Sequence, residues 1–325
     1  MPAWDPPNGS NYSPLPVTFI TGYLGAGKTT LLNRILAEDH GLRLAVIVNE
    51  FGDIDIDSQL VVGADEDIVA LTNGCICCAI QGDLITTLGG LYQRHLQQED
   101  GLFDAVVIET SGVFEPGPIV EIFFADPQIA DYFRLANLVT VIDAKFVQEQ
   151  LASNAEVQRQ IAYADTLLLN KADLVTDEMM VQVTQQLRTV NIEAEIIATR
   201  FSDAPLPAVL HPVVHLDAAD WRRRAGAESD NPPADGDHHH RHDHGDRAVR
   251  SMVLIGRTPL QRTRLRRSLD RWLAGQARQA FRYKGIVCLE DSPDAYVLQG
   301  VHEIYSLTRL RPWNRGEPQE TTLVL

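Results

Sequence analysis

A glycine-rich run at residues 22–30 has the spacing Gly-x4-Gly-Lys-Thr, which suits binding of nucleotide phosphates. Its glycines let backbone N–H groups approach phosphate oxygens, and the N-terminus of the helix expected after it adds partial positive charge. Lys28 would reach the terminal phosphates, and Thr29 would ligate Mg²⁺. An apolar strand before the run and an apolar helix pattern after it argue against a chance turn. The expected nucleotide-binding residues are Gly22, Gly25, Ala26, Gly27, Lys28, Thr29 and Thr30.

A carboxylate at the end of an apolar strand is a second candidate for the same site. Glu109 ends the apolar run 105–109, and Thr110-Ser111-Gly112 follows it. The carboxylate would hold Mg²⁺ directly or through water, and the N–H of Gly112 would reach the γ-phosphate. Many strands end in an acid, so this interpretation depends on the glycine-rich run. With that run present, we expect Lys28, Thr29 and Glu109 to be the catalytic residues.

The segment Asn170-Lys171-Ala172-Asp173 indicates which base is bound, and it follows the apolar run 166–169. In the pattern Asn-Lys-x-Asp, the aspartate accepts two hydrogen bonds from N1 and N2 of guanine, which the exocyclic amine of adenine cannot satisfy. We therefore expect GTP rather than ATP, with Asn170, Lys171 and Asp173 at the base. An ATP-dependent kinase would require this segment to be accidental.

Three thiols lie within four positions, at Cys75, Cys77 and Cys78, directly after the apolar run 68–71. Thiolates are soft ligands that suit Zn²⁺, Cu⁺ or Co²⁺. Three protein ligands leave one position open, which suits a site that must release its ion. The spacing differs from the paired Cys-x2-Cys of structural zinc sites. Buried structural cysteines are the alternative, and a neighbouring GTP site disfavours it.

Five of the ten histidines lie between Asp237 and Asp246. We expect this run to be a native flexible segment with weak, multi-site affinity for Zn²⁺, Ni²⁺ or Co²⁺. Filler sequence without a role and a purification tag are the alternatives, and the internal, interrupted position disfavours a tag. The candidate ligands are His238, His239, His240, His242 and His244.

Strand and helix patterns alternate along residues 16–199 and predict where these segments lie. Near-continuous apolar strands separated by helices are typical of α/β proteins with a doubly wound, mostly parallel sheet covered on both faces. In such a sheet the nucleotide lies at the strand ends, so the thiol segment would approach the phosphates. Strands are expected at 17–21, 44–49, 68–71, 105–109, 138–143, 166–170 and 195–199. Helices are expected near 28–38, 83–98, 116–124, 157–164 and 177–190.

A smaller α+β domain is expected near the C-terminus. Thr258-Pro259 would start a helix, and the helix's arginines indicate a solvated face or a surface for the acidic N-terminal domain rather than nucleic-acid binding. One helix face would carry Leu260, Leu265, Leu269, Trp272 and Leu273, and strands are expected at 251–256, 286–289, 296–299, 304–307 and 321–325. The predicted organisation is a disordered tail at 1–14, a P-loop GTPase domain at 15–217, a His-rich flexible linker at 218–249 and the α+β domain at 250–325.

The chain of 325 residues has a formal net charge of −16, which argues against binding nucleic acid or an anionic membrane through bulk charge. The acidity is confined to residues 1–200, which hold 10 basic and 28 acidic residues, whereas residues 201–325 carry a net charge of +2. Clustered cysteines suit a reducing compartment, and neither a signal peptide nor a membrane span is evident. We therefore expect a cytoplasmic protein.

Together these segments resemble the CobW-type family of P-loop GTPases, in the metallochaperone branch that includes the zinc-regulated GTPase metalloprotein activators. The resemblance covers about residues 15–325. A Cys-x-Cys-Cys run between a phosphate loop and a GTP base motif is quite specific to this family. The matching segments are 22–30, Val48-Asn49-Glu50-Phe51-Gly52, 75–78, 109–112, 170–173, Arg282-Tyr283-Lys284-Gly285 and Leu298-Gln299-Gly300-Val301.

The resemblance implies a GTP hydrolase whose cycle is coupled to binding a transition metal and transferring it to a client apo-metalloprotein. The three thiols would hold the metal, and Glu50 would join the metal site from a switch that responds to nucleotide. The implied cofactors are GTP, Mg²⁺ and Zn²⁺, or Co²⁺ in place of zinc. A cobalt-handling GTPase of cobalamin synthesis or nitrile hydratase maturation, and a metal store or sensor with little turnover, are the alternatives. We expect no nucleic-acid or membrane partner, and a homodimer stays open.

Overall fold

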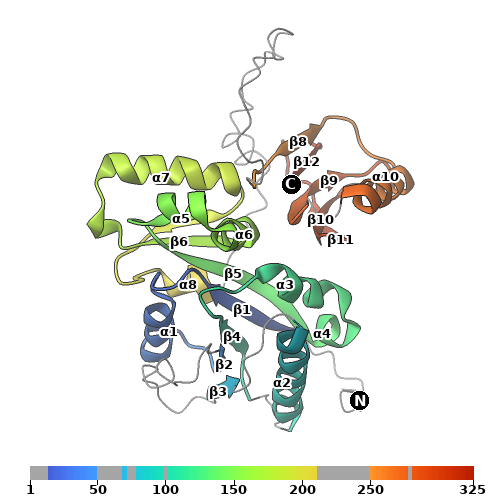
Figure 1. Ribbon diagram of the computed structural model, residues 1–325. Coiled ribbons are helices and arrows are strands. Elements are labelled where there is room, and N and C mark those ends of the chain that lie inside the picture. Colours follow the sequence, from blue (N-terminus) through green and yellow to red (C-terminus); the bar gives the residue numbers. More distant parts are fainter. Residues whose placement is uncertain (1–13, 50–67, 72–77, 98–101, 211–248, 277–279) are drawn as a thin grey trace. The chain divides into compact units, whose positions relative to one another are not determined.

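The computed structural model describes residues 14–49, 68–71, 78–97, 102–210, 249–276 and 280–325 (Figure 1). The chain divides into two compact units, one drawn from residues 1–184 and 194–214 and the other from 185–193 and 215–325. The predicted fold class is confirmed, because the first unit holds a parallel sheet with helices and the second an antiparallel sheet with a helix. The boundaries expected at 217 and 249 stay predictions.

The first unit is built on a doubly wound sheet. Its described strands are all parallel, in the order β3-β2-β4-β1-β5-β6-β7. The chain moves from the central strand toward one edge and later toward the other, so the order reverses beside β1, and ligands bind at such reversals. The strands are β1 Leu15–Thr21, β2 Leu44–Asn49, β3 Ile68–Leu71, β4 Ala105–Glu109, β5 Phe133–Asp143, β6 Thr166–Asn170 and β7 Glu195–Ala198.

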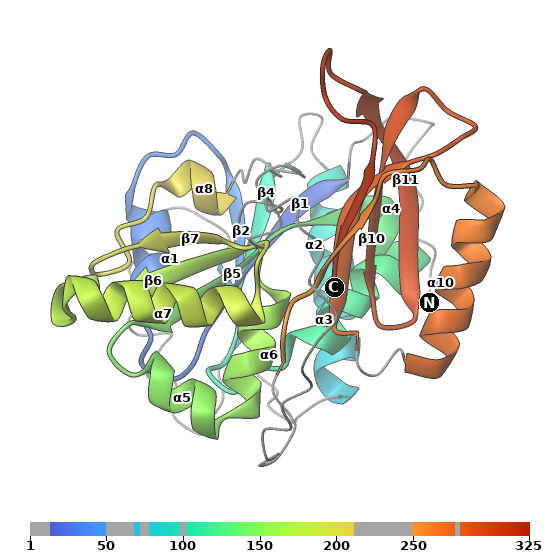
Figure 2. The same ribbon diagram turned by 90° about the horizontal axis from the view of Figure 1, so that it is seen from above.

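Helices cover both faces of this sheet, with α1 Lys28–Ala37 and α8 Leu206–Leu210 on one face and α3 and α6 on the other (Figure 2). Alternation along β1 explains the two layers. Ile20 packs in the same cluster as α1, whereas Phe19 meets Phe123 of α3 edge to face, with ring centroids 5.7 Å apart. The other helices are α2 Cys78–Leu96, α3 Pro116–Ala125, α4 Pro127–Tyr132, α5 Val147–Ser153, α6 Ala155–Tyr163 and α7 Asp177–Val190.

Several elements differ from the sequence expectation. Helix α2 begins at Cys78 rather than near residue 83, so the thiol run leads directly into it. Strand β5 begins at Phe133 rather than 138, because its first residues pair in parallel with the start of β1. Helices α4, α5 and α8 were not predicted, since 6, 7 and 5 residues show too little of a helical period. No helix in the described ranges has the length and apolar composition needed to cross a bilayer.

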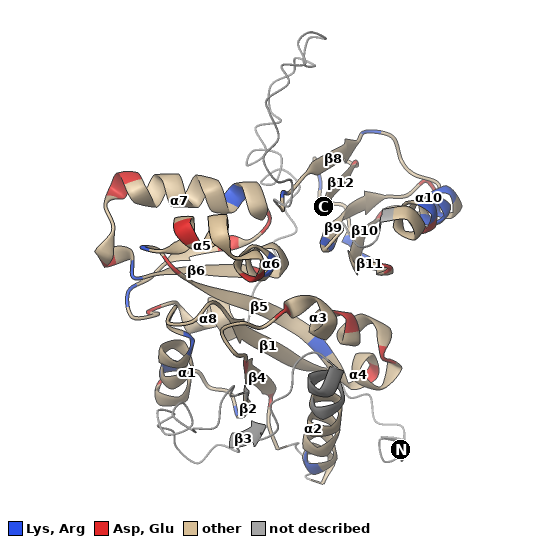
Figure 3. Ribbon diagram, in the orientation of Figure 1, with Lys and Arg blue, Asp and Glu red and all other residues tan. Residues whose placement is uncertain are grey.

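The described part of the second unit holds an antiparallel sheet in the order β11-β10-β9-β12-β8 and the long helix α10 Arg262–Gln276. Leu265, Leu269 and Leu273 of α10 pack on the sheet, as predicted. The helix also carries the exposed arginines Arg264, Arg266, Arg267 and Arg271, which give it its blue colour in Figure 3. The strands are β8 Val253–Gly256, β9 Arg282–Cys288, β10 Asp294–Val301, β11 Ile304–Pro312 and β12 Thr321–Val324.

The expected start of α10 at Thr258-Pro259 is wrong. The Leu260 N–H donates to the carbonyl of Cys288 at 2.8 Å, and the Leu260 carbonyl accepts from Glu290 at 3.0 Å. These bonds to the end of β9 and to the residues just after it hold residue 260 in a β-bridge, so the helix begins at Arg262.

The two segments of this unit that resemble the family, 282–285 and 298–301, pack closely against each other. Gly300 lies opposite Tyr283 in the β9–β10 pair, and a Cβ at Gly300 would overlap the Tyr283 ring. The Tyr283 hydroxyl donates to the carbonyls of His302 at 3.3 Å and Ile304 at 3.2 Å. Close packing therefore accounts for the glycine and the tyrosine at these positions of the sheet.

His95 holds the C-terminal end of α2 near the start of β4. Its Nδ1 accepts the N–H of Leu102 at 3.2 Å, and its ring lies 5.0 Å from the Phe103 ring, centroid to centroid. Burial lowers the pKa of His95 from its ordinary 6.5, Arg43 lowers the pKa further, and Asp104 opposes them. The neutral imidazole therefore fits this position, since Nδ1 must accept a hydrogen bond.

We expect acid to weaken the fold through His95. As pH falls below 6.5, the unfolded chain gains a proton at this residue, whereas the folded chain resists that proton, so the free energy of unfolding decreases. His95→Asn supplies an acceptor that does not titrate, so it should lose less stability than the parent chain between about pH 7.5 and 5.5, measured by urea unfolding. His40→Asn is the matched control, because His40 Nδ1 accepts the N–H of Leu42 at 3.2 Å in a partly exposed loop. Equal pH slopes for His95→Asn and the parent would contradict the prediction.

Candidate functional site

The phosphate loop lies between β1 and α1 and is closed by its own backbone. The Ala26 N–H donates to the Tyr23 carbonyl at 3.1 Å. Gly27, the N-cap of α1, has φ 115°, a conformation that side chains disfavour. A Cβ at Gly27 would also overlap the side chain of Asn170 and lie tightly against that of Ser202. Glycine is therefore needed here for both its conformation and the close approach of two other loops.

Asn170 joins the phosphate loop to the loops after β6 and β7. Its Nδ2 donates to the Ala26 carbonyl at 2.9 Å. Its Oδ1 accepts from the Ser202 N–H at 2.8 Å and from Thr199 Oγ1 at 3.2 Å. The residue is only 2% exposed, so this amide makes its bonds away from water. A single side chain thus sets how three loops meet.

Lys171 makes a second connection to the phosphate loop. Its Nζ donates to the Gly25 carbonyl at 2.8 Å and pairs with Asp143 Oδ2, at the end of β5, at 2.6 Å. Its backbone is left-handed, with φ 59°, at the turn into the short 3-10 helix η2 Ala172–Leu174. Asp173, the residue expected to recognise guanine, is exposed in η2. Residues 170–173, the base segment, therefore lie directly beside the phosphate loop.

The residues expected to be catalytic also lie close together. Thr29 Oγ1, in the first turn of α1, donates to Oε1 of the buried Glu109 at 2.9 Å. A hydroxyl and a carboxylate so close are hard oxygen donors of the kind that Mg²⁺ prefers. Lys28 precedes Thr29, and its Nζ lies 3.5 Å from the Tyr23 carbonyl of the phosphate loop. The ends of β1 and β4 thus bring together all three residues.

Gly112 packs against the phosphate loop from the β4 side. A Cβ at Gly112 would overlap both the side chain and the backbone nitrogen of Leu24. Earlier in the same loop, the Thr110 N–H donates to the Ile20 carbonyl of β1 at 3.0 Å. The loop after β4 is therefore held against β1 and its loop, as its expected role at the γ-phosphate requires.

Sequence reasoning missed Ser202 and Arg34, which complete this arrangement. Ser202 is fully buried, has φ 57°, and donates from Oγ to the Gly27 carbonyl at 2.9 Å. Arg34 of α1 donates to the carbonyls of Ser202 at 2.6 Å and Ala204 at 3.2 Å. No motif marks either residue. The available signal was that residues 200–204 follow the strand expected at 195–199, the next one along the chain after the strand that ends at Asn170.

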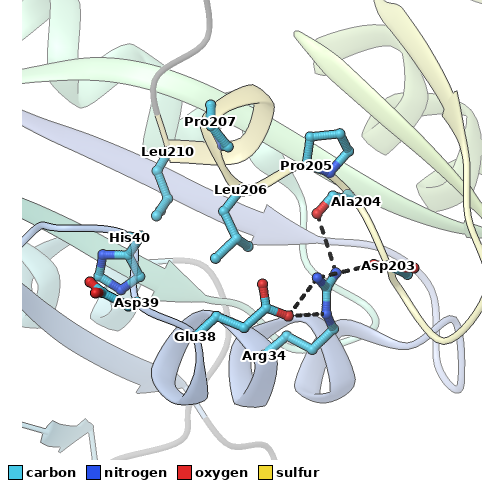
Figure 4. A pocket seen from close by; sticks show the side chains of 10 residues that line it. All are labelled: Arg34, Glu38, Asp39, His40, Asp203, Ala204, Pro205, Leu206, Pro207 and Leu210. Carbon is cyan, nitrogen blue, oxygen red and sulfur yellow. Dashed lines mark hydrogen bonds and ion pairs between the residues drawn. The ribbon is translucent and has the colours of Figure 1, made fainter.

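A cavity of about 530 Å³ lies next to Arg34 and is separate from the phosphate loop. Figure 4 shows the Arg34 guanidinium bonded to Glu38 on one side and to Ala204 and Asp203 on the other. The remaining lining residues include Asp39, His40 and Leu210. These residues follow the C-terminal end of α1 or belong to α8, whereas the phosphate loop precedes the N-terminus of α1.

The expected transition-metal ligands lie mostly outside the described residues. Cys78 is described only as the first residue of α2. In the described ranges, no three His, Cys, Asp or Glu side chains are grouped to hold a metal ion. Cys288 is buried in β9, and burial raises the pKa of its thiol, which disfavours the thiolate that a metal needs. Outside the described residues lie Cys75, Cys77, Glu50, His238, His239, His240, His242 and His244.

Comparison with known proteins matches both units to families. Residues 16–198 match the family described as CobW/HypB/UreG, nucleotide-binding domain, and residues 208–325 match the cobalamin synthesis protein cobW C-terminal domain. The chain is 31% identical over 316 residues to the zinc chaperone YjiA of Escherichia coli strain K12, which covers 96% of this chain and 94% of the relative. It is 40% identical over 199 residues to the zinc-regulated GTPase metalloprotein activator 1 of Schizosaccharomyces pombe, over 59% of this chain and 47% of the relative.

A solved structure is similar over nearly the whole chain. The crystal structure of Zn(II)-bound YjiA GTPase from E. coli matches with a TM-score of 0.66 and 25% identity. The match covers 96% of this chain and 94% of that one.

We expect Ser202→Ala to lower the free energy of unfolding by about 1 kcal/mol, because a buried hydrogen bond to the phosphate loop is lost. Nucleotide affinity should fall as well, since that bond holds the Gly27 carbonyl. Chemical unfolding and titration with a fluorescent nucleotide measure the two effects. Ser153→Ala is the matched control, because Ser153 Oγ donates to the Glu149 carbonyl at 2.8 Å on an exposed part of α5, where water can replace it. Effects of equal size in the two variants would argue against the role given to Ser202.

Proposed function

Because the chain belongs to the CobW/HypB/UreG family of nucleotide-binding proteins, we propose that it hydrolyses GTP and uses this cycle to transfer zinc to a client apo-metalloprotein. The observation that carries the proposal is the joining of the phosphate loop and the base segment into one bonded unit. Asn170 and Lys171 each donate to a carbonyl of the phosphate loop, at 2.9 and 2.8 Å. Binding a whole guanine nucleotide needs such a fixed distance between phosphate and base sites.

The nucleotide would lie along the carboxyl ends of β1, β4 and β6. The N-terminus of α1 and Lys28 would bind phosphate oxygens, and Asp173 would accept the guanine N1 and N2 hydrogens. Thr29 and Glu109 would hold Mg²⁺, which when bound offsets the charge that develops on the phosphates. Glu109 is the only acidic residue of β4 and is itself 4% exposed, so a cation at this point would balance a buried negative charge.

The transferred metal would bind at the neighbouring edge of the sheet. Asn49, the last residue of β2, pairs with Leu71, the last residue of β3. Along the chain, Glu50 directly follows β2 and the thiol segment follows β3, so we propose that both contribute to one metal site. The thiol run ends at the N-terminus of α2, whose partial positive charge favours the thiolate form of cysteine. Relatives are named zinc chaperones, so we propose zinc as the cargo of Cys75, Cys77 and Cys78.

The proposed partner is a client metalloprotein in the cytoplasm, where reduced thiols persist. A store or sensor would bind zinc by the same thiols without releasing phosphate. Phosphate release from GTP by the full chain therefore separates a chaperone with a working cycle from a store.

Asp173→Asn tests the assignment of the base. Asparagine cannot accept both guanine hydrogens, but its amide can donate to the carbonyl that xanthine carries in place of the guanine amine. We expect GTP affinity to fall by at least about 10-fold and affinity for xanthosine triphosphate to rise, measured by competition against a fluorescent nucleotide. Asp177→Asn, an exposed acid in the first turn of α7, should leave both affinities unchanged. If ATP competes as well as GTP for the parent chain, the base assignment is wrong.

Cys77→Ala tests the coupling between metal and nucleotide. We expect Zn²⁺ to change the rate of phosphate release in the parent chain and not in this variant, because the ion then lacks one of three thiolates. Cys288→Ala is the control, since that thiol is buried in β9, and it should respond to Zn²⁺ like the parent. Tight zinc retention without any phosphate release by the parent would identify a store and overturn the proposed chaperone.

A further inference from the structure

Gln160 of α6 reaches the loop that follows β4. Its Nε2 donates to the Phe114 carbonyl at 2.9 Å and, more weakly, to the Gly112 carbonyl at 3.4 Å. The residue is 1% exposed, so water does not compete for these bonds. Its backbone is held as well, because the Gln160 carbonyl accepts from Thr140 Oγ1 of β5 at 2.9 Å. Helix α6, itself bonded to β5, thus holds the loop after β4 through two hydrogen bonds.

The preceding residue of α6 holds the far end of the same loop. Arg159 Nε lies 3.0 Å from Glu115 Oε1, and Glu115 is the N-cap of α3. Two successive residues of α6 therefore contact residues 112–115. Arg159 and Glu115 are both partly exposed, with 24% and 49% of their side chains accessible. Solvent weakens that ion pair, which leaves the buried Gln160 amide as the stronger contact.

The opposite side of this loop contacts the phosphate loop. Gly112 packs so closely on Leu24 that a side chain at position 112 would overlap it. The Phe114 N–H donates to the Ser111 carbonyl at 3.2 Å and closes the turn between them. Residues 112–114 are therefore placed between the phosphate loop and the amide of Gln160.

We propose that Gln160 is a positioning residue for the γ-phosphate: it holds residues 112–114 against the phosphate loop, so that the Gly112 N–H meets the terminal phosphate of GTP. The inference rests on the GTP cycle proposed above. Both groups bonded by the amide nitrogen are carbonyls, so the position requires a donor. Glutamate at this position would set a carboxylate against carbonyl oxygens, and methionine would fill the space without a hydrogen bond.

In the proposed site, the loop would meet the nucleotide itself only at the γ-phosphate, so loss of the Gln160 amide should distinguish GTP from GDP. In Gln160→Met and Gln160→Glu we expect affinity for a non-hydrolysable GTP analogue to fall about 10-fold. GDP affinity should stay within about twofold, because no part of GDP reaches Gly112. The kcat for phosphate release should fall, since the terminal phosphate is less well held in the transition state.

Gln158→Met is the matched control. Gln158 lies on the same helix, and its Nε2 also donates to a backbone carbonyl, that of Leu151 in α5 at 2.8 Å, rather than to the loop after β4. This variant should bind GDP and the GTP analogue like the parent chain. Equal losses of GDP and analogue affinity in the Gln160 variants would show a merely structural role and overturn the inference, as would parent-like affinities in both.

Hydrogen exchange on the unaltered chain gives a second measurement that needs no variant. Residues 110–115 should exchange more slowly with the GTP analogue than with GDP, and equal exchange overturns the inference. If the parent binds GTP and releases phosphate while the Gln160 variants match it, only the role of Gln160 fails. If the parent binds no GTP at all, the proposed function fails and the role of Gln160 fails with it.

Discussion

One buried amide, the side chain of Asn170, controls how the loops at the carboxyl edge of the first sheet meet. It donates to the phosphate loop and accepts from the two residues that begin and close the turn after β7. Away from water these bonds are strong, and breaking one would leave a desolvated polar group. Gly27 must lack a side chain because this amide lies so close. The placement of Ser202 and, through it, the bonds to Arg34 of α1 follow from the same contact.

The order of the strands places different functional residues on the two sides of the phosphate loop. With β1 in the centre, its loop meets the end of β4 on one side and the ends of β5 and β6 on the other. The β4 side supplies Glu109 and Gly112, which suit a metal ion and a terminal phosphate. The β6 side supplies the base segment. Strand β2 lies next to β4, and β3 follows it. A ligand at the phosphates and a metal at the thiol segment would therefore act on neighbouring strand ends, which is a short route for coupling between two sites.

In the second unit, the residues that resemble the family have a different role from those of the first. Its family-like residues serve packing, because Gly300 accommodates the Tyr283 ring and Gly285 lies where a side chain would overlap the backbone of β12. Among its described residues, helix α10 carries the exposed arginines Arg264, Arg266, Arg267 and Arg271. The described residues that are expected to bind nucleotide all lie in the first unit. In this chain, the family-like segments of the first unit are those expected to contact nucleotide, whereas Gly285 and Gly300 of the second unit are explained by close packing.

The sequence by itself determined the phosphate loop, the base segment, most strands and the fold class, because each is recorded in a few adjacent residues or in a run of apolar ones. Only the tertiary structure decided the contacts of Ser202, Gln160 and Asp143, which meet their partners across 175, 46 and 28 positions of the chain. Pairing with β9 likewise moved the start of α10 to Arg262, against a good local signal for an earlier start. Local patterns report what neighbouring residues favour. Contacts between distant strands and loops leave no periodic trace, because any polar residue with the right reach can make them.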